Sequence, residues 1–117
     1  MTEKFTSPCQ PPEGYVRELL TILVEEGQEV GIRCTKALRF GVEEVQPGQE
    51  LDNADRIGRE VGDFLEVLDR LVTAGVIRQS SIEDGKANKK RQLDKFMQTG
   101  IRPWELPEHR PMLTLSR

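Results

Sequence analysis

Two pairs of acidic residues are the strongest candidates for a functional site in this chain, because of their spacing. Glu26 and Glu29 lie in one apolar segment, and Glu60 and Asp63 lie in the next. A separation of three residues places both members of a pair on one side of a helix. Carboxylate oxygens are the ligands that Mg²⁺ prefers, and Mg²⁺ commonly binds together with substrate phosphates. The four residues therefore form a candidate Mg²⁺ site, with Mn²⁺ as the alternative ion.

Apolar residues with helical spacing predict three helices in an all-α fold. The predicted helices cover residues 15–39, 53–75 and 80–98. Phe40-Gly41 is the expected stop of the first helix. Asn53 is the expected N-cap of the second helix, and Ser80 or Ser81 is the expected N-cap of the third. One helical domain over residues 15–98 thus follows an irregular lead-in (1–14) and precedes an extended, proline-containing tail (99–117).

The two acidic pairs are expected to converge when the first two helices pack together. With Leu23 and Ile57 as references, both pairs fall at roughly −60° and −120° from their apolar stripes. A short connection makes the two helices antiparallel neighbours, so that equivalent flanks meet. The alternatives are that these carboxylates form a solvated helix face, or that Arg33, Arg56 and Arg59 neutralise them through salt bridges.

Composition excludes several other classes of function. Seventeen Lys and Arg against twenty Asp and Glu give a net charge of −3, which argues against specific binding of nucleic acid. No apolar run is long enough to span a membrane, and residues 1–4 lack a signal-peptide pattern, so a cytoplasmic location is expected. Cys9 and Cys34 form no zinc-ligand pattern. His109, the only histidine, lies in the tail, which disfavours a nucleophile–histidine mechanism.

Three segments together resemble the MazG-like branch of the all-α nucleoside triphosphate pyrophosphohydrolases, in particular its short single-domain members. The segments are EEGQE at 25–29, KALRFG at 36–41 and EVGDFL at 60–65. The resemblance covers about residues 15–97, and the related phosphoribosyl-ATP pyrophosphatases fit less well. It implies Mg²⁺-dependent cleavage of a nucleoside triphosphate to the monophosphate and pyrophosphate. It also implies helical bundles that are completed by dimer or tetramer formation.

The resemblance assigns roles to the individual carboxylates. Glu26 and Glu29 match the first metal-binding pair of the family, and Glu60 and Asp63 match the second. Glu25 matches an acidic position often found before the first pair. Phosphoanhydride hydrolysis also needs a group that takes a proton from the attacking water. Glu29 is the first candidate for this catalytic base, and Glu26 is the second.

Cations in the third predicted helix are candidate phosphate ligands. A helical wheel places Lys86 and Lys90 on the side of the apolar residues, whereas an Asn-x-x-Arg element typical of the family favours Asn88 and Arg91. Both pairs remain candidates. Lys36 is a further candidate, although its place near a helix end is also explained by the helix dipole. Trp104 is interpreted as an anchor of the tail.

These patterns predict a Mg²⁺-dependent nucleotide pyrophosphohydrolase whose substrate is a (deoxy)nucleoside triphosphate. The alternative is a non-catalytic helical oligomer that binds a nucleotide or a partner protein. The second helix is apolar over a wide face, because Val61, Leu65 and Val72 extend one edge of its stripe. One partner helix covers only part of such a face, so we expect a dimer or tetramer with a four-helix core.

Overall fold

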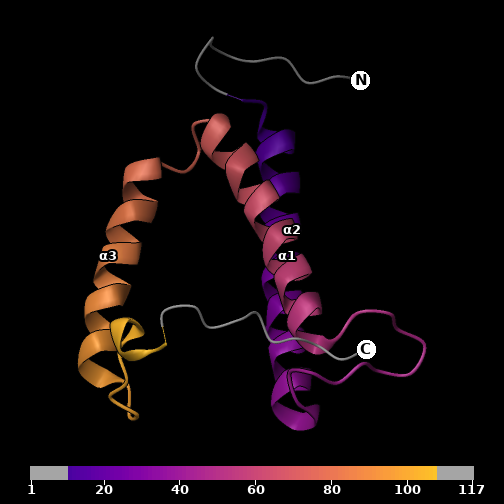
Figure 1. The fold of residues 1–117 in the computed structure, drawn as a ribbon. Helices are drawn as coiled ribbons and strands as arrows, with labels where there is room; N and C mark the ends of the chain where they lie inside the picture. The colour runs from indigo at the N-terminus through magenta and orange to yellow at the C-terminus, as the bar shows by residue number, and fades with distance from the viewer. Residues whose placement is uncertain (1–10, 108–117) are drawn as a thin grey trace. The chain divides into compact units, whose positions relative to one another are not determined.

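The structure, a computed structural model, describes residues 11–107 as three α-helices and one 3₁₀ helix without any strand (Figure 1). The elements are α1 (Glu13–Phe40), α2 (Asn53–Thr73), α3 (Gln79–Phe96) and η1 (Pro103–Glu105). The predicted all-α class is therefore confirmed for this part of the chain. Cys9, His109 and the outer parts of the predicted lead-in and tail lie outside the described residues.

Helices α1 and α2 pack side by side and form a hairpin that is connected by residues 41–52 (Figure 1). Leu19 and Ala37 of α1 and Leu71 of α2 are its buried apolar residues. The Phe64 ring of α2 lies beside Gly27 of α1, where an added Cβ atom would lie 3.7 Å from Cε2 of Phe64. This contact places Gly27 of α1 opposite Phe64 of α2.

The start of α2 differs by one residue from the predicted cap. Asp52 is the N-cap, and its Oδ1 accepts a hydrogen bond from the backbone N–H of Asp55 at 2.8 Å. The prediction of Asn53 was wrong because this side chain reaches back to the connecting loop. Its Nδ2 donates to the Gly41 carbonyl at 2.8 Å and to Glu44 Oε1 at 3.1 Å. Asp52 and Asn53 are both buried, and together they join the loop to the helix.

Of the two other predicted helix ends, the stop of α1 is confirmed and the start of α3 is wrong. Gly41 has a φ of 100° and donates its N–H to the Ala37 carbonyl at 2.8 Å, so the predicted stop of α1 is confirmed. Ser80 and Ser81 were wrong as caps of α3. The N-cap is Arg78, which makes no side-chain capping bond, and the serines lie inside the first turn.

The described residues divide into two compact units, the α1·α2 hairpin at 11–77 and a second unit at 78–107. In the second unit, the Arg102 side chain donates from Nη2 to the Asp94 carbonyl at 3.1 Å. The same guanidinium group lies 5.6 Å from the ring centroid of Trp104. The tail region thus contains η1, held by Arg102 to α3, where only extended chain was expected. The single domain over 15–98 stays a prediction.

Candidate metal centre

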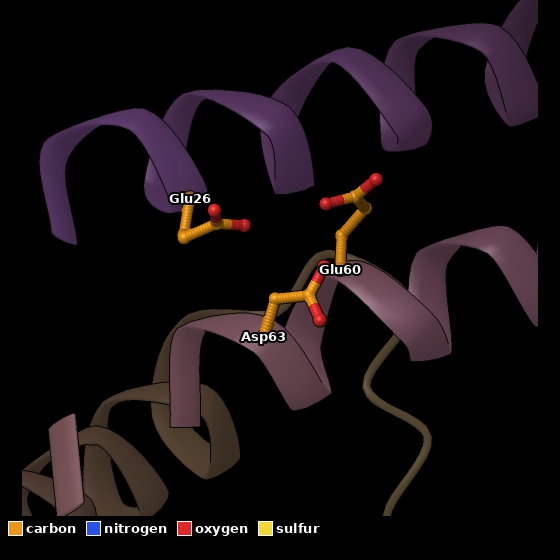
Figure 2. Close-up of side chains that lie close together, drawn as sticks. All are labelled: Glu26, Glu60 and Asp63. Atoms are coloured by element: carbon orange, nitrogen blue, oxygen red, sulfur yellow. The ribbon is translucent and has the colours of Figure 1, made fainter. Parts of the chain in front are cut away.

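Three carboxylates converge at the seam between α1 and α2. Glu26 comes from α1, and Glu60 and Asp63 come from α2 (Figure 2). One oxygen from each residue lies within 4.8 Å of the other two. Oxygens on opposite sides of one Mg²⁺ ion lie about 4.2 Å apart. Small rotations of these side chains would therefore let one divalent ion contact all three residues, which we call the acidic triad.

The helical hairpin explains why the triad forms. Glu60 and Asp63 lie three residues apart and project from one side of α2. Glu26 precedes Gly27, and Asp63 precedes Phe64, so the triad lies next to the contact between Gly27 and the Phe64 ring. An added Cβ atom at Gly27 would meet the Phe64 ring at an ordinary van der Waals distance, so the ring packs directly against this part of α1.

Glu29 was predicted as a fourth ligand, but it does not belong to the group of converging oxygens. It lies one helical turn after Glu26 and is half-buried. Its charge still acts on Glu26, whose pKa is raised above its usual value. Burial is the largest cause of the raised pKa, and the charges of the neighbouring carboxylates add to it in the order Asp63, Glu60, Glu25 and Glu29. The triad is thus a region of concentrated negative charge.

No arginine side chain in the described part of the chain forms a salt bridge with the triad. Within residues 11–107, no salt bridge includes Glu26, Glu60 or Asp63. Arg56 instead donates from Nη1 to Gln46 Oε1 at 2.8 Å. Arg33 is half-buried, and its Nε and Nη1 are covered without a hydrogen-bond acceptor. The alternative of a salt-bridged cluster is therefore not realised in the described residues.

The predicted phosphate ligands of α3 lie in the second unit, and all four are exposed. Arg91 Nη2 lies 3.5 Å from Asn88 Oδ1, and Lys90 Nζ lies 3.8 Å from Asp94 Oδ2. The fourth ligand, Lys86, has no such contact among the described residues. Lys36 belongs to α1, where its Nζ lies 5.9 Å from the ring centroid of Phe40. Lys36 belongs to the same unit as the triad, whereas the four residues of α3 belong to the other unit. All five stay predicted phosphate ligands.

Sequence reasoning missed a cavity of about 610 Å³ in the second unit. The C-terminal part of α3 and the following residues line it, mainly with Leu93, Met97, Ile101, Trp104 and Leu106. Trp104 is 65% exposed, so it lines an open surface and is not buried as an anchor. Arg102 is the residue that ties this segment to α3.

None of the helices in the described part of the chain combines the length and the apolar character that a membrane span requires. Comparisons with protein-family models, with curated proteins and with solved structures find no match to this chain.

Proposed function

We propose that this chain is a Mg²⁺-dependent nucleotide pyrophosphohydrolase of the MazG-like kind, which acts in the cytoplasm on a (deoxy)nucleoside triphosphate. The observation that supports the proposal is the convergence of Glu26, Glu60 and Asp63 from two helices. Three anionic oxygens without a cationic partner among the described residues are a suitable donor set for a divalent ion. The same residues lie in the segments that resemble the MazG-like family.

The proposed reaction uses the triad to hold Mg²⁺ and a further carboxylate to activate water. The ion would neutralise charge on the phosphate oxygens. Glu29 lies outside the triad, so its carboxylate is available to orient a water molecule and to accept its proton. Glu26 remains the second candidate for this base. The water oxygen bonds to the α-phosphorus, the bond to the bridging oxygen breaks, and pyrophosphate leaves.

The proposal assigns the predicted cations to the phosphate chain. Lys36 and the four residues of α3 remain the proposed ligands of the phosphate oxygens or the base. Loss of such a ligand should raise KM more than it lowers kcat, provided that it binds the ground state and the transition state equally. The residues of α3 are Lys86, Asn88, Lys90 and Arg91.

An oligomer with a four-helix core is also part of the proposal. Leu20 and Val24 on α1 and Val61 and Leu65 on α2 are exposed large apolar residues. Relative to the buried Leu19 and Leu71, they fall at roughly 80–140° on equivalent flanks of the two helices. In an antiparallel hairpin these flanks form one surface, which we call the apolar flank. Pairing of two apolar flanks would remove this surface from water.

Product analysis tests the proposed activity. The purified chain is incubated with Mg²⁺ and a panel of common and modified nucleoside triphosphates, and the products are separated by chromatography. We expect monophosphate and pyrophosphate, with orthophosphate appearing only after addition of an inorganic pyrophosphatase. Glu60→Gln should lose activity while keeping its helical content, because it removes a metal ligand and no apolar contact.

The matched control is Asp69→Asn, which removes one exposed carboxylate elsewhere on α2 and should keep full activity. Orthophosphate as the first product would contradict the assignment of the cleaved bond. Nucleotide binding without turnover would instead support the non-catalytic alternative.

A further inference from the structure

Arg33 has hydrogen-bonding capacity that the described residues do not use. Its Nε and Nη1 have almost no accessible surface, and neither has an acceptor. The side chain is half-buried, whereas Arg17 and Arg39 on the same helix are exposed. Covering these two nitrogens without an acceptor is unfavourable, because their N–H donors have lost water without gaining another partner. A ligand that supplies the acceptor would remove this cost.

The position of Arg33 relates it to the acidic triad. Arg33 follows Glu26 by seven residues, so both residues lie on the face of α1 that meets α2. Long side chains on a helix lean toward its N-terminus, which for Arg33 is the direction of Glu29 and Glu26. Its Cα is about 6 Å further along the axis than that of Glu29. The seam thus has negative charge at the triad and an unpaired positive charge one to two turns away.

The described residues of the protein do not offer Arg33 a suitable acceptor. Arg33 forms no salt bridge with any carboxylate among residues 11–107. Asn53 Oδ1 is the other covered atom without a partner in this part of the chain. The Asn53 amide is fixed on Gly41 and Glu44 at the loop end of α1, which is opposite to the direction in which Arg33 leans.

We propose that Arg33 binds phosphate oxygens of a metal–polyphosphate ligand whose metal ion is held by the triad. This inference rests on the proposed function and names the phosphate chain as the part of the substrate that the seam recognises. A guanidinium group is always charged and matches two phosphate oxygens at once. Carboxylates that hold a metal ion are weaker hydrogen-bond acceptors for the Arg33 guanidinium group. The phosphate oxygens of the metal–polyphosphate ligand can accept its hydrogen bonds instead. Arg33 is thus a substrate-binding residue that acts together with the triad.

Calorimetric titration with two probes tests the inference. The probes are Mg²⁺ alone and a premixed complex of Mg²⁺ with inorganic tripolyphosphate. Arg33→Ala should weaken binding of the complex by about 10- to 100-fold, the range expected for lost hydrogen bonds to a charged group. Arg33→Lys should lie in between, because it keeps the charge but loses the fork. Binding of Mg²⁺ alone should not weaken in either variant.

The matched control is Arg17→Ala, which removes the same charge from an exposed site on α1 and should leave both affinities unchanged. Equal affinity of the wild type and Arg33→Ala for the complex would overturn the inference. So would a parallel loss of affinity for both probes, because Arg33 would then only support the fold.

Two further readouts separate this inference from the proposed function. If Arg33→Ala does not fold, the ¹⁵Nε resonance of Arg33 in the wild type replaces it as the measurement. A shift of this resonance on addition of the complex supports the inference, and the absence of a shift overturns it. Arg33-dependent binding of the complex without nucleotide cleavage would refute the proposed activity alone. Nucleotide cleavage without binding of the complex would refute the role of Arg33 alone.

Discussion

The carboxyl group of Glu26 lies among like charges, and its pKa is raised above the usual value. Burial at the helix seam is the main cause, followed by the charge of Asp63 and then by that of Glu60. A carboxyl group that holds its proton more tightly in the folded than in the unfolded chain makes folding less favourable once both states are ionised. The site therefore has an energetic cost in the absence of a cation.

The first prediction concerns the dependence of stability on pH. As pH rises from the ordinary range of Glu through the raised pKa of Glu26, the unfolded chain releases its proton first. The free energy of unfolding of the metal-free protein should therefore fall across this window. Glu26→Gln should flatten this dependence and stabilise the metal-free protein at neutral pH. Urea denaturation at a series of pH values measures both effects, and a steeper dependence in the variant would contradict them.

The second prediction concerns metal binding. Mg²⁺ or Mn²⁺ should raise the thermal stability, because a ligand that binds only the folded state stabilises it by about 2.7 kcal/mol at a hundredfold excess over Kd. Glu60→Gln should reduce this shift, whereas Glu18→Gln on the exposed face of α1 should not. Thermal melts with and without each ion provide the measurement. Equal shifts in the two variants would show that the ion binds elsewhere.

At the level of residues, the sequence predicted on which face of its helix a side chain lies better than it predicted which side chains meet. Helical spacing correctly indicated that Glu26, Glu60 and Asp63 would meet at one seam. It did not indicate that Glu29 would lie outside the group, because side-chain rotamers and the exact height of two packed helices decide this. The sequence also did not indicate that Arg33 Nε and Nη1 lack an acceptor. A sequence shows which acidic residues are close along the chain, but not whether their oxygens lie within hydrogen-bonding distance.

At the level of elements, the start of α2 depends on a buried capping residue. The third prediction is that Asp52→Ala destabilises the protein by about 1 kcal/mol or more, because Asp52 Oδ1 accepts the Asp55 N–H and the residue is buried. Asp52→Ser should lose less, since its hydroxyl can accept the same bond. Urea denaturation measures the difference, and equal loss in both variants would show that the cap is not the cause.

The helices were predictable because their apolar periodicity is local information, whereas two of their caps were not. Asn and Ser are typical N-cap residues, which made Asn53, Ser80 and Ser81 reasonable choices. Asn53 instead bonds to Gly41, twelve positions earlier in the chain. Such a contact depends on how the loop returns, and single-sequence patterns do not contain that path. Gly41 was predictable because its stop signal acts within one helical turn.

At the level of the whole molecule, charge is distributed unevenly between the two units. Residues 11–77 contain fourteen Asp and Glu against seven Lys and Arg, whereas residues 78–107 contain four against seven. The net charge of −3 therefore combines an acidic hairpin with a basic second unit. The hairpin also buries few apolar side chains for its size. The apolar surface that stays exposed favours association with further protein surface, whereas the negative charge of the hairpin opposes its pairing with a second copy.

The fourth prediction is that the protein is at least a dimer at micromolar concentration. Val24→Asp or Leu65→Asp should shift it toward the monomer, because each places a charge on the apolar flank. Glu18→Lys, at an exposed position on the other side of α1 from Leu20 and Val24, should not change the oligomeric state. Light scattering coupled to size-exclusion chromatography measures the mass. A stable and active wild-type monomer would contradict the four-helix core.

The loop that joins α1 and α2 should accept inserted residues at its tip without a change in the geometry of the triad. Its tip is a turn in which Gly48 has a φ of 82° and Gln49 donates its N–H to the Gln46 carbonyl at 2.9 Å. Pro47 and Gly48 are exposed, whereas the bonds of Asn53 close the base of the loop. Doubling the length of a flexible loop costs only about 0.6 kcal/mol. A short peptide tag inserted between Pro47 and Gly48 should therefore leave Mg²⁺ affinity unchanged, which would make the loop tip a place to label or immobilise the protein.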